Sequence, residues 1–246
     1  MSEREVKNIV ASVLARLRNH AKSTNAPFQQ VLQQYAIERF LYRISKSKHA
    51  ESVVLKGALL LKTIGIPTAR PTMDIDMLRR GKADQATLMG LVRDCAALEV
   101  EPDGLTFLDD SVAAEEITKD LEYKGTRVLL DARMDNVRLR IQVDFGVGDV
   151  MVPGPRMIEY PAVLDGDIIQ LLAYPVESAI AEKLQAMVAL GRQASGEALQ
   201  ARRWRRAVPL INPSGSRWWR LKYRVDGKEE VAVTRRLSRG VAEVSS

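Results

Sequence analysis

Three aspartates stand in positions that favour metal-dependent chemistry. Asp74 and Asp76 lie in the alternating segment TMDIDM, and residues two apart on a strand project to the same face, so both carboxylates can bind the same divalent cations. Asp144 ends a second alternating segment, IQVDFG, and Gly146 and Gly148 follow it. A third carboxylate on a neighbouring strand would complete a two-metal site for in-line displacement at phosphorus.

An Asp-x-Asp pair also occurs on solvated strand faces, so the motif alone leaves a structural interpretation open. The preceding segment, VVLKGALLL, favours a functional one because it predicts a strand, a glycine turn and then a helix. Backbone N–H groups at the start of a helix bind phosphate, and Gly57 with the small Ala58 permits close approach. Lys56 adjoins this turn. We therefore expect a phosphate cradle facing the aspartates.

Three further residues are candidates for binding a nucleotide. Arg70 and Thr72, just ahead of the aspartates, could contact a triphosphate, although Arg70 is equally well explained as a surface charge. Lys183 lies in ESAIAEKLQAM beside the apolar stripe of an expected helix. It could place a point charge on a phosphate, although a lysine at such a position commonly extends along a helix surface into solvent.

The elements that must position these residues mix helices and strands, which predicts an α+β fold. Apolar residues recur at helical spacing in the first two segments, strand-like alternation follows, and Pro175 suits the first turn of a closing helix. We expect helices over 3–20, 28–44, 58–64, 83–98 and 175–190, strands over 52–55, 72–77 and 168–172, and a hairpin of 123–133 with 137–145 across the turn Met134–Asn136.

Composition limits the classes of protein to which the chain can belong. It has 246 residues and 46% hydrophobic residues, which excludes a disordered chain, and its one cysteine and two histidines exclude a disulfide scaffold and disfavour a cysteine- or histidine-based metal centre. No apolar run is long enough for a membrane helix, and the N-terminus is too charged for a signal peptide. We expect a cytoplasmic protein without membrane partners.

Charge is unevenly distributed along the chain. Residues 192–246 contain 13 Lys and Arg against 5 Asp and Glu, a net charge of +8, whereas residues 1–191 carry 24 basic and 26 acidic residues, a net of −2. The sequence therefore predicts three parts, which are a helical segment over 1–48, a core over 49–191 and a basic tail over 192–246.

Four motifs in this order, VVLKGALLL, RPTMDIDML, IQVDFGVGD and YPVESAIAEKLQAM, resemble the AbiEii/AbiGii-type nucleotidyltransferase toxins of the polymerase-β-like superfamily. The resemblance covers about Phe40 to Gly191. It implies a polymerase-β-like core that transfers a nucleoside monophosphate from an NTP to an acceptor such as tRNA, with Mg²⁺ or Mn²⁺ as cofactor. It also implies a cognate antitoxin and a role in abortive infection, a form of phage defence.

The resemblance assigns roles to individual residues. It makes Gly57 the turn glycine, Asp74 and Asp76 the metal ligands, Asp144 the third carboxylate, and Lys183 the NTP-binding lysine. The family pattern then continues into an Arg-x-Lys-Asp-x-x-Asp-Leu-like segment and further helices, which this chain lacks. We therefore expect impaired transfer, and a catalytically inactive remnant that binds nucleotide or a partner is the alternative.

The tail resembles a different kind of protein. Residues 209–230 contain NPSGSRWWRLKYRVDGKEE, which is similar to an N-terminal fragment of phage-type tyrosine integrases. Aromatic and apolar residues alternate with cations before Asp226-Gly227, which predicts a short basic β hairpin. Such a strand could bind a phosphate backbone, so a DNA-binding protein is a further alternative. A fragment this short folds poorly by itself, and we do not expect specific DNA binding.

Overall fold

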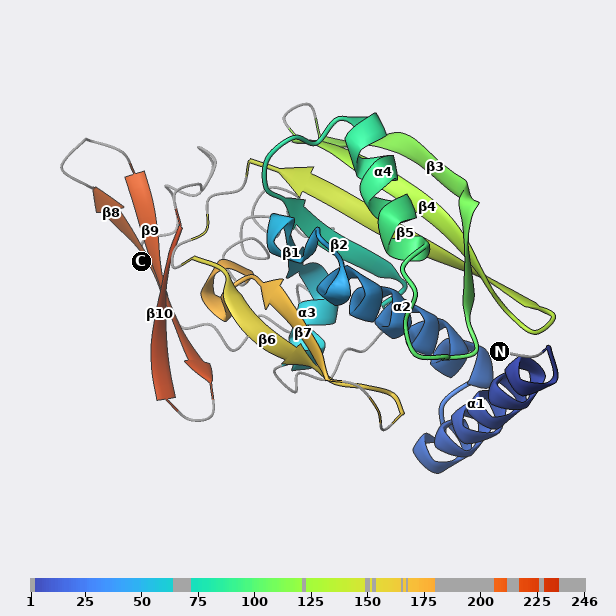
Figure 1. The fold of residues 1–246 in the computed structure, drawn as a ribbon. Coiled ribbons are helices and arrows are strands. Elements are labelled where there is room, and N and C mark those ends of the chain that lie inside the picture. The colour runs from blue at the N-terminus through green and yellow to red at the C-terminus, as the bar shows by residue number, and fades with distance from the viewer. Residues whose placement is uncertain are drawn as a thin grey trace. The chain divides into compact units, whose positions relative to one another are not determined.

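The computed structural model describes residues 3–63, 72–120, 123–148, 151, 154–164, 166, 168–179, 206–211, 217–225 and 228–234. The chain divides into two compact units. The first contains residues 1–149 and 157–173, and the second contains residues 150–156 and 174–246. Figure 1 shows the ribbon, and each unit is described by itself below.

A seven-stranded mixed sheet forms the centre of the first unit. Its strand order is β3-β4-β5-β2-β1-β7-β6. The pairs β2–β5 and β1–β7 are parallel, whereas β1–β2, β3–β4 and β4–β5 are antiparallel. The strands are β1 Val53–Lys56, β2 Asp74–Arg79, β3 Thr106–Asp120, β4 Tyr123–Met134, β5 Val137–Val147, β6 Arg156–Tyr160 and β7 Ile169–Ala173. This architecture confirms the predicted α+β class.

Helices pack against this sheet. The helices are α1 Glu3–Thr24, α2 Phe28–Lys46, α3 Gly57–Thr63 and α4 Gln85–Ala96, and a 3₁₀ turn spans Ala50–Ser52. Helix α2 packs on β5 and β7, α4 packs on β3 and β4, and α1 packs on α2 (Figure 1). The first turn of α4 is capped by Asp84, whose carboxylate accepts a 3.0 Å hydrogen bond from the Thr87 N–H.

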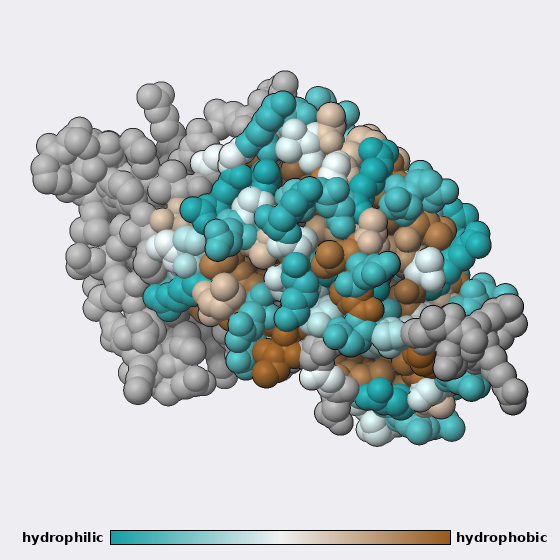
Figure 2. All heavy atoms as spheres, in the orientation of Figure 1, coloured by the Kyte–Doolittle hydropathy of each residue, from teal (hydrophilic) through white to brown (hydrophobic). Residues whose placement is uncertain are grey.

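Apolar residues on the strands build the core under these helices. Ile75, Met77 and Val143 are fully buried, and so are Phe40 and Leu41 of α2. The side of the first unit that faces the viewer in Figure 2 is largely hydrophilic, with apolar residues in scattered groups. None of the helices in the described parts of the chain combines the length and apolar character needed to cross a bilayer.

A buried ionic cluster attaches α2 to the loop that leads into β3. Asp103 accepts hydrogen bonds from Arg39 Nε at 2.8 Å, from Arg43 Nη1 at 2.6 Å and from the Leu105 N–H at 3.0 Å. The Tyr35 hydroxyl donates to the Asp103 carbonyl oxygen at 3.0 Å. Because Asp103 is only 6% exposed, the two arginines neutralise a carboxylate that water cannot solvate.

Strands β8 Arg206–Ile211, β9 Arg217–Val225 and β10 Lys228–Thr234 form a separate antiparallel sheet in the second unit, in the order β10-β9-β8. Val225 pairs with Lys228, which confirms the predicted hairpin. Strand β8 extends this hairpin to three strands and was not predicted, because the basic residues around it show no alternation with apolar ones.

Candidate functional site

Strand β2 presents Asp74 and Asp76 on the face of the sheet opposite the apolar core. Ile75 and Met77 alternate with these aspartates and are fully buried, whereas both aspartates are partly exposed. The strand therefore holds two carboxylates on one face where solvent can reach them. This arrangement is the one that the Asp-x-Asp spacing predicted.

Pairing across the sheet brings Asp144 and Lys56 beside Asp76. In the parallel pair β2–β5, Asp76 lies opposite Asp144, and in the antiparallel pair β1–β2 it lies opposite Lys56. Directly paired residues project from the same face of a sheet. Lys56, Asp76 and Asp144 therefore form a row across three neighbouring strands, next to Asp74.

Arg127 on β4 extends this row. It pairs with Asp144 in the antiparallel β4–β5 hairpin. Its guanidinium donates two hydrogen bonds to the Asp144 carboxylate, from Nε to Oδ1 at 2.9 Å and from Nη2 to Oδ2 at 3.0 Å. Gln142 Nε2 donates to the same Oδ1 at 3.3 Å, and the Asp144 side chain is 8% exposed. Arg127 Nη1 also lies 3.5 Å from Glu115 Oε1 on β3.

The electrostatics of this row follow from the contacts of Arg127. Hydrogen bonding to Asp144 raises the pKa of the guanidinium, burial opposes this shift, and the negative charges of Asp144, Asp74 and Glu115 reinforce it. Arg127 is therefore a fixed cation within a group of carboxylates.

Gly57 lies against Asp76 at the junction of β1 and α3. Its φ is +71°, a left-handed conformation that other residues adopt at a cost. A Cβ built on Gly57 would lie 2.0 Å from Asp76 Oδ2, so no residue with a side chain fits without displacing that carboxylate. The glycine turn predicted from the sequence therefore holds Asp76 close to the backbone at the start of α3.

The other predicted nucleotide-binding residues differ in what the structure says of them. Ala58 is buried in α3, and Thr72 lies partly exposed two residues before β2. Arg70 and Lys183 lie outside the described residues. The structure thus brings together Asp74, Asp76, Asp144, Lys56 and Gly57, with Ala58 directly after Gly57.

Arg127 was not predicted as a site residue, because the register predicted for the β4–β5 hairpin differs from the register in the structure. A turn of three residues, Met134–Asn136, would pair Arg127 with Val143 and place it on the core face. In the structure Met134 pairs with Val137, so the loop has two residues and Arg127 lies opposite Asp144. A slip of one residue moves every side chain of a strand to the other face. An arginine within the apolar run of β4 was the available signal.

The acidic donors on this face fit a magnesium-type ion in part. Asp74 and Asp76 offer carboxylate oxygens, and Mg²⁺ in nucleotide enzymes is commonly held by one or two carboxylates together with substrate phosphates. Asp144 is engaged by Arg127, and across the described ranges no three acidic, histidine or cysteine side chains are grouped to hold a metal ion. The donor chemistry therefore suits a cation that arrives with phosphate ligands.

Residues 39–204 match the model of the family described as nucleotidyl transferase AbiEii toxin, type IV toxin–antitoxin system. This match covers more than half of the chain and contains every residue of the site described above.

Two solved structures from Helicobacter pylori share a limited likeness with the chain. JHP933 and a protein described as a candidate nucleotidyltransferase are each 17% identical, with a TM-score of 0.42. The likeness covers 64% of this chain, and the chain spans 57% and 59% of the two H. pylori chains, respectively. No curated protein matches the chain at a significant level.

Proposed function

Because the chain belongs to the AbiEii nucleotidyl transferase toxin family, we propose that it transfers a nucleoside monophosphate from an NTP to an acceptor such as tRNA, with Mg²⁺ or Mn²⁺. The observation that carries this proposal is the register that sets Asp76 of β2 beside Asp144 of β5, with Asp74 on the same face. Two adjacent strands thus supply three carboxylates to one surface.

In the reaction, a hydroxyl oxygen of the acceptor bonds to the α-phosphorus, the bond to pyrophosphate breaks, and the hydroxyl proton passes to a base. Asp74 and Asp76 would hold the divalent cation, which offsets the charge of the triphosphate and of the departing pyrophosphate. Asp144 would be the third ligand of the cation and is also the candidate base. Its pairing with Arg127 keeps the carboxylate oriented toward this face.

The turn at Gly57 would bind the triphosphate beside the aspartates. Backbone N–H groups of Gly57 and Ala58 are its candidate ligands, and Lys56 adds a positive charge from the adjacent strand. Arg70, Thr72 and Lys183 complete the proposed nucleotide set on the ground of family resemblance. Helix α3 has only seven residues, so we assign the phosphate contacts to the turn and not to a helix dipole.

The lack of the fourth family motif leads us to propose a slow enzyme. Phosphoryl transfer depends on positioning and charge stabilisation, and the residues of that motif would contribute to both. The ion pair between Asp144 and Arg127 favours a second candidate function, in which the chain is a remnant that binds nucleotide without transferring it. A cognate antitoxin is the partner that the toxin–antitoxin family leads us to propose for the chain.

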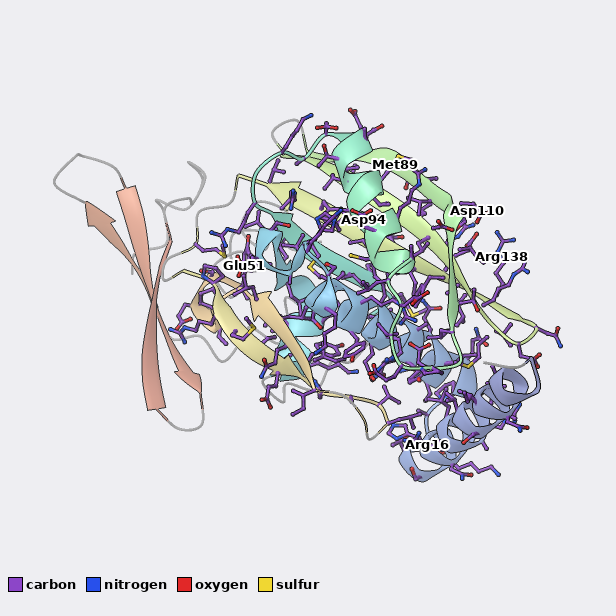
Figure 3. All side chains as sticks on the ribbon, in the orientation of Figure 1. Arg16, Glu51, Met89, Asp94, Asp110 and Arg138 are labelled. Carbon is purple, nitrogen blue, oxygen red and sulfur yellow. The ribbon has the colours of Figure 1, made fainter. Side chains whose placement is uncertain are left out.

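A transfer assay tests the proposal. Purified protein is incubated with Mg²⁺, each labelled NTP in turn and total tRNA, beside the Asp74→Asn/Asp76→Asn variant. Asp110→Asn is the matched control, because this exposed aspartate lies on β3 and its side chain points to solvent (Figure 3).

We expect label transfer by the wild type and by Asp110→Asn, and none by the double variant. Transfer that survives the double substitution would refute the proposed cation site. Nucleotide binding without transfer in every protein would favour the inactive remnant over the enzyme.

A further inference from the structure

The geometry of the Arg127–Asp144 pair affects the binding of a cation to the acidic face, which is the face of the sheet that carries Asp74, Asp76 and Asp144. Both carboxylate oxygens of Asp144 accept from the guanidinium, at 2.9 Å and 3.0 Å, and the carboxylate is largely shielded from water. Such a two-point contact is among the stronger hydrogen-bonded pairs found in proteins. A cation that binds Asp144 must therefore either share these oxygens with the guanidinium or displace it.

Arg127 has a second partner already in place. Glu115 on β3 lies directly opposite Arg127 in the β3–β4 register, so its side chain projects from the same face. The remaining nitrogen, Nη1, is 3.5 Å from Glu115 Oε1, and Glu115 is 56% exposed. The guanidinium can therefore move from Asp144 toward Glu115 by rotation of its own side chain, without any change in strand pairing.

The row across the sheet thus sets two adjacent aspartates between two basic residues, with Glu115 at one end. It runs from Glu115 through Arg127, Asp144 and Asp76 to Lys56, on β3, β4, β5, β2 and β1 in turn. A fixed positive charge next to Asp144 also repels any cation that approaches this carboxylate. Both effects, the occupied oxygens and the repulsion, disfavour cation binding before nucleotide arrives.

We propose that Arg127 is a positioning residue that holds Asp144 in the cation-free site and competes with a divalent cation for its carboxylate, with Glu115 as the partner that receives the guanidinium when Asp144 is released. This inference rests on the proposed function, because it takes Asp144 as a cation ligand. It goes beyond that function by predicting that the free protein binds divalent cations weakly.

A Mn²⁺ titration without nucleotide or acceptor tests the competition, with free Mn²⁺ measured by electron paramagnetic resonance. Arg127→Gln removes the competing charge and should tighten Mn²⁺ binding about tenfold, the scale of one charge-assisted hydrogen bond. Arg140→Gln is the matched control, because Arg140 pairs with Asp131 on the same hairpin. This pair lies away from the row that runs from Glu115 to Lys56, which we call the acidic row. Arg140→Gln should bind Mn²⁺ as the wild type does.

Three further tests show whether the effect passes through the proposed partners. In an Asp144→Asn background, Arg127→Gln should tighten Mn²⁺ binding by much less than tenfold, since only the charge repulsion is relieved and there is no carboxylate to release. Glu115→Gln removes the alternative partner of Arg127, so it should weaken Mn²⁺ binding about threefold. Arg127→Lys keeps the charge but not the two-point contact, and its affinity should lie between those of the wild type and Arg127→Gln.

Equal Mn²⁺ affinities for the wild type, Arg127→Gln and Arg127→Lys would overturn the inference, and so would a full tenfold tightening with Asn at position 144. Failure of all proteins to bind Mn²⁺ would also overturn it. If Arg127→Gln does not fold, the Arg127→Lys and Glu115→Gln titrations decide the matter. The proposed function is judged separately, because a protein that shows the Mn²⁺ pattern but no label transfer supports the competition and contradicts the enzyme.

Discussion

At the scale of single residues, the site depends on close contacts that tolerate little change. Gly57 has no room for a side chain because Asp76 Oδ2 occupies the space in which a Cβ would stand. Asp144 is oriented by three hydrogen bonds from Arg127 and Gln142. These contacts tie the position of each carboxylate to its neighbours on adjacent strands.

Replacing Gly57 by alanine should damage both stability and the proposed activity. Alanine at a positive φ costs about 1–2 kcal/mol, and the clash with Asp76 adds to this cost. Displacement of a reacting group by about 1 Å can reduce rates about a hundredfold. We expect a lower free energy of unfolding, measured by urea denaturation, and a loss of label transfer of that order.

Gly90→Ala is the matched control for this substitution. Gly90 lies inside α4, and a Cβ built there meets nothing within 4 Å. Alanine should stabilise the helix by about 0.5–1 kcal/mol and leave transfer unchanged. A Gly57→Ala protein that matches Gly90→Ala in both measurements would show that the close approach to Asp76 has no effect.

Glu38 of α2 is a second residue whose surroundings lead to a testable prediction, because they change the pKa of its carboxyl group. Burial raises its pKa to about 7, although a hydrogen bond from the Val163 N–H at 2.6 Å and the charges of Arg39 and Lys62 act in the opposite direction. The folded protein therefore binds this proton more tightly than the unfolded chain, in which the ordinary pKa is 4.5. The resulting stability is complete below the unfolded pKa and is lost as the pH rises through 7.

Glu38→Gln should remove this pH dependence. Between about pH 5 and about pH 8, the wild type should lose about 2 kcal/mol of unfolding free energy relative to the variant. The measurement is urea denaturation at several pH values, with the exposed Glu99→Gln as a control that follows the wild type. Parallel pH profiles for the wild type and Glu38→Gln would contradict a raised pKa.

At the scale of elements, the ion pairs of α2 and the register of the β4–β5 hairpin position the site. Helix α2 covers β5, the strand that carries Asp144, and Asp103 attaches this helix to the loop before β3. The hairpin register then decides which residues face the site. Local sequence signals predict such elements well but leave their registry to the tertiary structure.

Asp103→Asn should loosen α2 more than any exposed ion pair could. It removes the carboxylate that the buried guanidiniums of Arg39 and Arg43 share, and breaking a buried ion pair typically destabilises a protein by about 3–5 kcal/mol. Asp94→Asn is the control. Asp94, which is labelled on α4 in Figure 3, is 45% exposed and contacts Lys48, so its loss should cost about 0–1 kcal/mol. Equal effects in thermal denaturation would refute the role assigned to Asp103.

The sequence predicted most of the elements around the site, and the reasons for its failures are physical. Strand β2 and helix α4 were predicted because their apolar periodicity is clear, and β1 was predicted because its short apolar run is typical of a buried strand. Strand β6 was missed because it is short and its Met157 is 60% exposed at the edge of the sheet, so no alternation marks it. The pairing of Arg127 with Asp144 depends on one turn residue, and periodicity alone does not fix turn length.

At the scale of the whole molecule, charge separates the two ends of the chain. Residues 1–191 carry a net charge of −2, whereas residues 192–246 carry +8. The acidic row belongs to the first unit, and strand β9, with Arg217, Arg220, Lys222 and Arg224, belongs to the second. A basic overall charge therefore gives no information about the ligand of the site, which must be judged from its own residues.

The basic tail should bind duplex DNA through charge alone. Along β9 the cations alternate in sequence with Trp219, Leu221 and Tyr223, and Glu229 of β10 pairs with Arg224 in the β9–β10 register. A DNA backbone carries the same phosphate charge whatever its base sequence. We therefore expect similar affinities for unrelated duplexes, falling about tenfold or more as salt rises from about 50 to about 200 mM.

Fluorescence anisotropy with two unrelated labelled duplexes measures both properties, and a chain that lacks residues 209–246 is the control. The shortened chain keeps every residue of the acidic row, so its label transfer should equal that of the full chain while its DNA binding is lost. A strong preference for one duplex at the higher salt concentration would mean that the tail reads sequence. Loss of transfer on deletion would mean that the tail, although it resembles part of another protein, has become part of the enzyme.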